Sequence, residues 1–205
     1  MNALRIPLVL LAAAALALSG CSTSDPDAAV SPTPSPTATV PPGYGYGPKK
    51  AGNTTPAPAV FVGASVRADQ TFAPSTDVDV VDLRFTGWRG RDLTGCDVRY
   101  VDPPATDAVS GEPVEIEGAA LLQVTCPQVT SVGPDSDRFS SPDTENVTEV
   151  VKTGYDGSTL TWTIGLQRRA PFGLALVTFG SGGSAREYPE ARRNAVDGVS
   201  ISILQ

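Results

Sequence analysis

The chain has 205 residues, a formal net charge of −7 and no histidine. The acidic balance argues against nucleic-acid binding, which depends on Lys and Arg side chains that neutralise phosphates. Without histidine, Ser-His-Asp and Cys-His catalytic sites cannot form, and the commonest metal ligand is missing. Because neither a GxSxG motif nor a phosphate loop ending in GK[ST] occurs, we predict a protein that is not an enzyme and needs no cofactor or metal.

The first 20 residues have the pattern of a secretory signal peptide. Arg5 precedes an apolar run over residues 6–18, which is shorter than the roughly 20 residues that a transmembrane helix needs. The run ends in Leu18-Ser19-Gly20-Cys21, which resembles the lipobox of bacterial lipoproteins. We expect cleavage before Cys21 and lipidation of its thiol, which would anchor the protein at the extracytoplasmic face of the cell membrane. An ordinary signal peptide followed by a chance cysteine is the alternative.

Residues 21–59 have the composition of a disordered tether. Pro, Ser, Thr and Gly dominate, as in the run over residues 31–37, and no apolar periodicity occurs. Such a segment buries too little surface to offset its ordering entropy. Tyr44 and Tyr46 within it are interpreted as incidental. We therefore predict a spacer that lifts a folded domain, residues 60–205, away from the membrane.

The chain after residue 59 alternates apolar and polar residues in short runs, as half-buried β-strands do. The expected inward-facing residues are Val60, Val62 and Ala64; Val81, Leu83 and Phe85; Val114 and Ile116; Leu160, Trp162, Ile164 and Leu166; and Val199, Ile201 and Ile203. Asp82 and Arg84, which alternate with Val81, Leu83 and Phe85, are expected to face water. Residues 174–179 are nearly all apolar and are expected to be buried on both faces.

The segments between these runs carry turn residues. We predict a bulge at Val80-Val81, a turn at 155–158, a long acidic surface loop at 130–145 and a short helix at 189–195. Short strands divided by Gly, Pro and Asp turns predict an all-β fold, a small antiparallel β-sandwich.

Two cysteines remain if Cys21 carries lipid, namely Cys96 and Cys126. In an exported protein such a pair predicts a disulfide bond. Cys96 shares a strand face with Val98, and Cys126 shares one with Val124, so both thiols are expected to point into the apolar layer. The bond should contribute roughly 3–4 kcal/mol by closing a loop in the unfolded chain. Two separate buried thiols are the alternative.

Aromatic and basic residues in turns supply the candidate binding residues. Trp88 lies in a Gly- and Arg-rich stretch after the Phe85 strand, and Arg168 and Arg169 follow the Trp162 strand. Trp and Arg are enriched in binding patches, and aromatic rings stack on cations. The alternatives are a loop anchor for Trp88 and a solvated hairpin end for the two arginines.

The order of several strand motifs resembles the AMIN-like domain of actinobacterial lipoproteins. The motifs occupy residues 78–87, 96–101, 111–114, 118–124, Asn146-Val147-Thr148-Glu149-Val150, 160–166 and Arg169-Ala170-Pro171-Phe172. The resemblance covers residues 60–179, and residues 181–197 depart from it as an insertion before the last strand. It implies a non-catalytic β-sandwich associated with cell-wall peptidoglycan and envelope localisation, and it implies no particular ligand-contact residue.

Together these observations predict a lipid-anchored, non-catalytic binding module of the cell envelope, with peptidoglycan or another cell-wall component as its ligand. The alternative is a protein–protein scaffold or accessory lipoprotein that docks an envelope enzyme or transporter. A hydrolase that uses carboxylates alone is a third reading, because acidic residues are plentiful. The expected partners are the membrane, through the lipid, and either peptidoglycan or an envelope protein.

Overall fold

The computed structural model of the chain describes residues 40–52, 58–69, 76–86, 95–133, 136–179 and 196–205. All of them belong to one unit, which spans Thr39–Gln205. The predicted signal peptide, Cys21, most of the tether, Trp88 and the predicted helix at 189–195 lie outside the described residues. Within the described ranges, no helix is long and apolar enough to cross a membrane.

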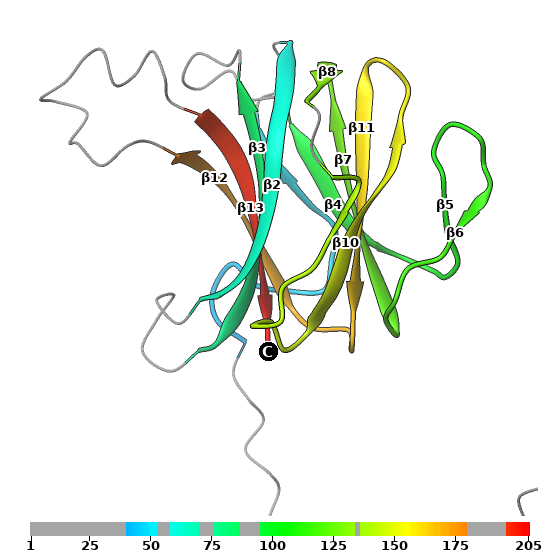
Figure 1. Cartoon of the computed structure of the whole chain (residues 1–205). Helices are drawn as coiled ribbons and strands as arrows, with labels where there is room; N and C mark the ends of the chain where they lie inside the picture. The colour runs from blue at the N-terminus through cyan, green and yellow to red at the C-terminus, as the bar shows by residue number, and fades with distance from the viewer. Residues whose placement is uncertain (1–39, 53–57, 70–75, 87–94, 134–135, 180–195) are drawn as a thin grey trace, which may run out of the picture. The chain divides into compact units, whose positions relative to one another are not determined.

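Two β-sheets pack face to face around a shared apolar core (Figure 1). The six-stranded sheet has the order β1-β4-β7-β11-β10-β9, and the five-stranded sheet has the order β12-β13-β3-β2-β8. The strands of the first are β1 (Lys49–Ala51), β4 (Cys96–Val101), β7 (Ala120–Pro127), β9 (Arg138–Phe139), β10 (Val147–Tyr155) and β11 (Thr159–Leu166). Those of the second are β2 (Ala59–Asp69), β3 (Val78–Thr86), β8 (Val129–Val132), β12 (Phe172–Phe179) and β13 (Val196–Leu204).

Strand pairing is antiparallel throughout both sheets except between β2 and β8, which run parallel. The short strands β5 (Ala105–Thr106) and β6 (Pro113–Val114) form a separate hairpin that stands beside the sandwich (Figure 1). The predicted all-β fold, a small antiparallel β-sandwich, is confirmed.

Alternate residues of the central strands fill the space between the sheets. The predicted inward residues of β3, β11 and β13 are all buried: Val81, Leu83, Phe85, Leu160, Trp162, Ile164, Leu166, Val199, Ile201 and Ile203. Trp162 contacts both Phe61 of one sheet and Phe139 of the other, with ring centroids 5.4 and 5.3 Å away. This large ring therefore ties the two sheets together.

The predicted disulfide is present between Cys96 and Cys126, with an S–S distance of 2.10 Å. It joins the neighbouring strands β4 and β7, and both cysteines are fully buried. The alternation that placed both thiols in the apolar layer is confirmed, because both belong to the core.

The structure corrects the strand phase at β2. Phe61 is fully buried and Val62 is 41% exposed, the reverse of the predicted alternation. The bulge lies between Phe61 and Gly63, and not at Val80-Val81, where the register of β3 is continuous with both neighbours. Because the extra residue changes which side chains face the core, the predicted alternation is wrong for Val62, whereas Ala64, beyond the bulge, packs against the core as predicted.

The predicted water-facing side of β3 is wrong for Asp82. Its residue exposure is only 3%, and it forms an ion pair with Arg67 of β2. Arg84 is half-buried and donates to Ser65 Oγ at 2.8 Å. Polar residues of this outer face therefore pair across neighbouring strands, although Arg84 Nε is buried without a hydrogen-bond partner among the described residues.

Two-sided burial of residues 174–179 is also wrong. Ala175, Leu176 and Thr178 are exposed because β12 is an edge strand of its sheet. Elsewhere the predicted strand at Val114 and Ile116 shrinks to β6, and β8 and β9 interrupt the predicted loop at 130–145.

The predicted turn at 155–158 is confirmed as the β10–β11 connection. Asp156 Oδ1 accepts hydrogen bonds from the N–H groups of Ser158 and Thr159 at 2.8 and 2.6 Å. Gly157 has a φ of 89°, a conformation that glycine adopts without steric cost. These bonds lower the pKa of Asp156 below its ordinary value.

The last part of the predicted tether belongs to the fold, so the prediction of disorder is wrong for residues 40–52. Lys49–Ala51 forms β1 and pairs with β4 at the edge of the six-stranded sheet. Gly45 makes a bridge with Phe172 at the edge of the five-stranded sheet. Residues 45–51, here called the strap, thus join the edges of the two sheets.

Candidate functional site

The two arginines predicted to bind lie where the chain passes from one sheet to the other. Residues 167–171, here called the crossing, connect β11 of the six-stranded sheet with β12 of the five-stranded sheet. Both Arg168 and Arg169 are exposed. The crossing is therefore the part of the predicted site that the structure describes, since Trp88 lies outside the described residues.

Asn146 and Tyr100 hold the backbone of the crossing. The N–H of Gln167 donates to the Asn146 carbonyl at 2.8 Å, and the N–H of Arg168 donates to Asn146 Oδ1 at 3.0 Å. The N–H of Ala170 donates to the Tyr100 hydroxyl at 3.0 Å, and this hydroxyl donates back to the Ala170 carbonyl. The two arginine side chains thus project from a backbone with fixed geometry.

Asn146 is itself fixed by a buried carboxylate from the opposite sheet. Asp79 accepts hydrogen bonds from the N–H groups of Asn146 and Val147 at 2.6 and 2.7 Å and from Gln205 Nε2 at 2.8 Å. Asn146 Nδ2 donates to the carbonyl of Leu204 at 3.2 Å. Asp79 and Asn146 are both fully buried, so these bonds form in a low-dielectric setting where an unpaired group would be costly.

Aromatic rings and cations gather around the crossing. The Arg169 guanidinium lies over the Tyr100 ring at 4.4 Å, and Lys49 Nζ lies 5.4 Å from the centre of the Phe172 ring. Tyr100 and Phe172 meet edge to face with centroids 5.8 Å apart. Tyr46 is 49% exposed, and its phenol adds to the rise in the pKa of Tyr100 that burial causes. We call Tyr46, Lys49, Tyr100, Arg169 and Phe172 the cation–aromatic face.

Tyr100 keeps its proton at neutral pH. Burial raises the pKa of this phenol above its ordinary value, while the hydrogen bond with Ala170 and the positive charge of Arg169 act in the opposite direction. The neutral hydroxyl can therefore both donate to and accept from the crossing backbone.

The strap supplies part of the cation–aromatic face. Gly45 N donates to the Phe172 carbonyl at 3.1 Å, and Phe172 N donates to the Gly45 carbonyl at 3.0 Å. Just before the strap, the Tyr44 ring covers Gly173, where an added Cβ would lie 3.2 Å from the ring. These contacts bring Tyr46 and Lys49 beside residues more than 50 positions later in the chain.

The face carries positive charge on an acidic protein. Lys49, Arg168 and Arg169 form no ion pair with another described residue, whereas the adjacent Lys50 is paired with Asp97 at 3.4 Å. Cations beside aromatic rings, without carboxylates to neutralise them, can bind an anionic group and stack on the apolar side of a sugar or peptide.

Sequence reasoning missed Tyr46 and Lys49. The available signal was the alternation Gly43-Tyr44-Gly45-Tyr46 followed by Lys49-Lys50, because aromatic and basic residues are unusual in a plain spacer. Among the described residues, no group of three His, Cys, Asp or Glu side chains could hold a metal ion.

Comparison with known proteins supports the resemblance seen in the strand motifs. The family model of the AMIN-like domain matches residues 66–180, which is more than half of the chain. The match includes Tyr100, the crossing and Phe172, and it ends before β13. The strap precedes it. No curated protein and no solved structure matches the chain.

Proposed function

Because the chain belongs to the AMIN-like domain family, we propose that it is a lipid-anchored, non-catalytic module of the bacterial cell envelope that binds cell-wall peptidoglycan. The family match supports association with the cell wall. The cation–aromatic face carries the proposal for how binding occurs, since it places two cations without ion pairs to other described residues beside the half-buried Tyr100 ring and the exposed Tyr46 ring, on a protein with a net charge of −7.

Peptidoglycan offers both features that such a face would recognise, namely sugar rings and the carboxylates of its peptide stems. Arg169 and Lys49 would attract the carboxylates, and the exposed ring of Tyr46 would stack on a sugar. The buried hydrogen bonds of Asn146 and Asp79 fix the crossing, so binding need not order it.

Sedimentation with purified cell-wall sacculi tests this proposal. The chain from residue 21, with C21S to keep it in solution, should sediment with sacculi, and Lys49→Ala with Arg169→Ala should weaken binding by roughly three- to tenfold. Lys50→Ala is the matched control, because Lys50 neighbours Lys49 but pairs with Asp97 instead of facing Phe172. No sedimentation, or equal binding by the double variant and the control, would contradict the proposal. Trp88→Ala in the same assay tests the predicted contact outside the described residues.

The membrane anchor is a separate part of the proposal and rests on the lipobox ending in Cys21. Replacing Cys21 with alanine in the producing bacterium should move the protein from the membrane fraction to a soluble or unprocessed form. Membrane retention that is unchanged in this variant would overturn the anchor and leave the proposed cell-wall binding untouched.

One observation favours the alternative of a protein partner. Within the described residues, β12 pairs with β13 on one side and meets only the Gly45 bridge on the other, and Leu176 on it is 43% exposed. An edge strand of this kind can pair with an extended segment of another protein. Crosslinking in intact cells discriminates the two, because a single reproducible protein partner without sacculus binding would favour the scaffold.

A further inference from the structure

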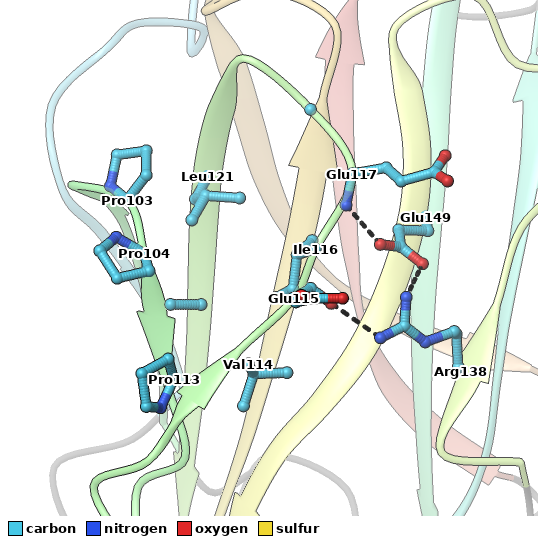
Figure 2. A pocket seen from close by; sticks show the side chains of 12 residues that line it. Pro103, Pro104, Pro113, Val114, Glu115, Ile116, Glu117, Leu121, Arg138 and Glu149 are labelled. Atoms are coloured by element: carbon cyan, nitrogen blue, oxygen red, sulfur yellow. Dashed lines mark hydrogen bonds and ion pairs between the residues drawn. The ribbon is translucent and has the colours of Figure 1, made fainter.

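A hollow of about 590 Å³ lies between the β5–β6 hairpin and the outer face of the six-stranded sheet, and its lining includes no residue of the cation–aromatic face (Figure 2). Its walls come from residues 103–105 and 113–118, and Leu121 of β7, Arg138 and Glu149 complete it. The volume is in the range of sites that hold small molecules.

The hollow is formed before any ligand arrives, because the hairpin is tied to the sheet on both sides of it. The N–H of Ala108 donates to the Thr153 carbonyl at 2.7 Å, and the N–H of Ala119 donates to the Leu166 carbonyl at 2.8 Å. Between these points the Thr148 hydroxyl donates to the carbonyl of Glu117. Such preorganisation lowers the entropy that a ligand must lose on binding.

One side of the hollow is aliphatic. Pro103, Pro104 and Pro113 lie opposite Val114, Ile116 and Leu121 (Figure 2). Proline rings fix their own backbone angle and have no N–H to satisfy, so they make a stiff apolar wall. None of the 12 residues that line the hollow is aromatic, which disfavours a sugar ring or a nucleobase.

The other side is polar and carries an excess of negative charge. Arg138 forms an ion pair with Glu149 and donates to the Glu115 carbonyl at 2.8 Å, while Glu149 also accepts from the N–H of Glu117 at 2.5 Å. Arg138 therefore neutralises Glu149, and the exposed Glu115 and Glu117 add two further carboxylates to the lining. An anionic ligand would be repelled at this site.

We propose that this hollow binds a primary alkylammonium group, with its hydrocarbon chain against the prolines and its charge near Glu115 and Glu117. The aliphatic wall selects the chain, and the two carboxylates select the charge. The site is independent of the proposed peptidoglycan binding, because it shares no residue with the cation–aromatic face.

NMR titration with three probes of equal length tests the proposal. The chain from residue 21 with C21S is titrated with hexylammonium, hexanol and hexanoate, and amide shifts are followed at residues 103–121. Hexylammonium should bind about three- to tenfold more tightly than hexanoate, with hexanol between them. Equal affinities for the two charged probes, or the absence of shifts in this segment with every probe, would overturn the proposal.

Matched variants locate the site and its charge preference. The double variant E115Q/E117Q should bring the affinity for hexylammonium close to that for hexanol. E112Q, on the same hairpin but outside the lining, should leave both affinities unchanged. V114W should block the hollow, and V109W, at the 61% exposed hairpin tip, should not. An unchanged preference in E115Q/E117Q would contradict the assignment even if hexylammonium binds.

Two further probes identify the source of the alkylammonium. Cadaverine represents a free amine, and the peptide Gly-Lys-Gly represents a lysine side chain held in a polypeptide. Tighter binding of one assigns the natural ligand to that source. Failure of both to shift residues 103–121 would overturn the proposal.

Discussion

The cation–aromatic face and the hollow are two regions of one sandwich that differ in both charge and assembly. The face collects Tyr46, Tyr100 and Arg169 from three distant segments and is positive, while the hollow comes largely from one continuous excursion over residues 103–121 and is negative. A site that depends on distant segments depends on the whole fold. A site built from one excursion depends on how that excursion is attached to the sheet.

The largest expected effect concerns Asp79, which fixes the crossing of the cation–aromatic face through Asn146. Asp79→Ala leaves the buried N–H groups of Asn146 and Val147 without their acceptor, and each such loss costs 1–3 kcal/mol, so we expect a loss of about 4 kcal/mol in the free energy of unfolding. Urea unfolding measures it. Asp77→Ala is the control, because the Asp77 side chain is exposed and only its backbone carbonyl bonds to Gln205. Equal stabilities of the two variants would contradict a supporting role for Asp79.

The next effect concerns the hollow alone. A Cβ on Gly165 would lie 1.9 Å from the Glu117 carbonyl and 2.7 Å from Thr148 Oγ1, so Gly165→Ala must push residues 115–118 away from the sheet. We expect a loss of about 1–3 kcal/mol, with NMR shifts in the excursion and little change at Tyr100. Gly47→Ala is the control, since a Cβ there meets nothing within 4 Å. Shifts that reach the crossing would show that the two regions are coupled.

How much of the fold and of each region the sequence predicts depends on whether a local pattern or the meeting of distant segments forms it. The central strands β3, β11 and β13 were largely predictable because apolar and polar residues alternate over residues 81–85, 159–164 and 199–203, and the apolar side chains of these runs meet in one core. The exposure of Arg168 and Arg169 was predictable because they follow such a strand, and their role in binding stays a prediction. The positions of Asp79 and Asn146, by contrast, are set by where the ends of the two sheets meet, and no local pattern encodes that meeting.

The failures have physical reasons as well. One extra residue at the bulge between Phe61 and Gly63 reverses the face of β2, and the edge position of β12 exposes an apolar run that composition alone assigns to the interior. The strap has too few apolar residues to show a period. Backbone pairing at Gly45 and Lys49–Ala51, and not the burial of apolar side chains, holds it against the two sheets. The hollow arises from the spacing between a hairpin and a sheet, which has no signature in the sequence.

A smaller effect tests how strongly the ring and the hydroxyl of Tyr100 each support the face. Tyr100→Phe keeps the ring beneath Arg169 but removes the hydrogen bonds to Ala170, and we expect a loss of about 1 kcal/mol in the free energy of unfolding. Tyr100→Leu also removes the ring and should cost more. If the two variants lose equal stability in urea unfolding, the stacking of Arg169 contributes nothing to the fold.

The smallest effect is the pH dependence that Tyr100 adds to the face. Burial raises the pKa of this phenol in the folded state, so the folded protein holds the proton more tightly than the unfolded chain does. The stability that Tyr100 contributes is therefore fully present below its unfolded pKa, about 10, and is lost as the pH rises through the folded value. Between pH 9 and 11 the urea midpoint of the native protein should fall more steeply than that of Tyr100→Phe, which retains the other four tyrosines. Parallel curves would mean that the phenol titrates alike in both states, and the Tyr100 hydroxyl would then contribute nothing pH-dependent to the crossing.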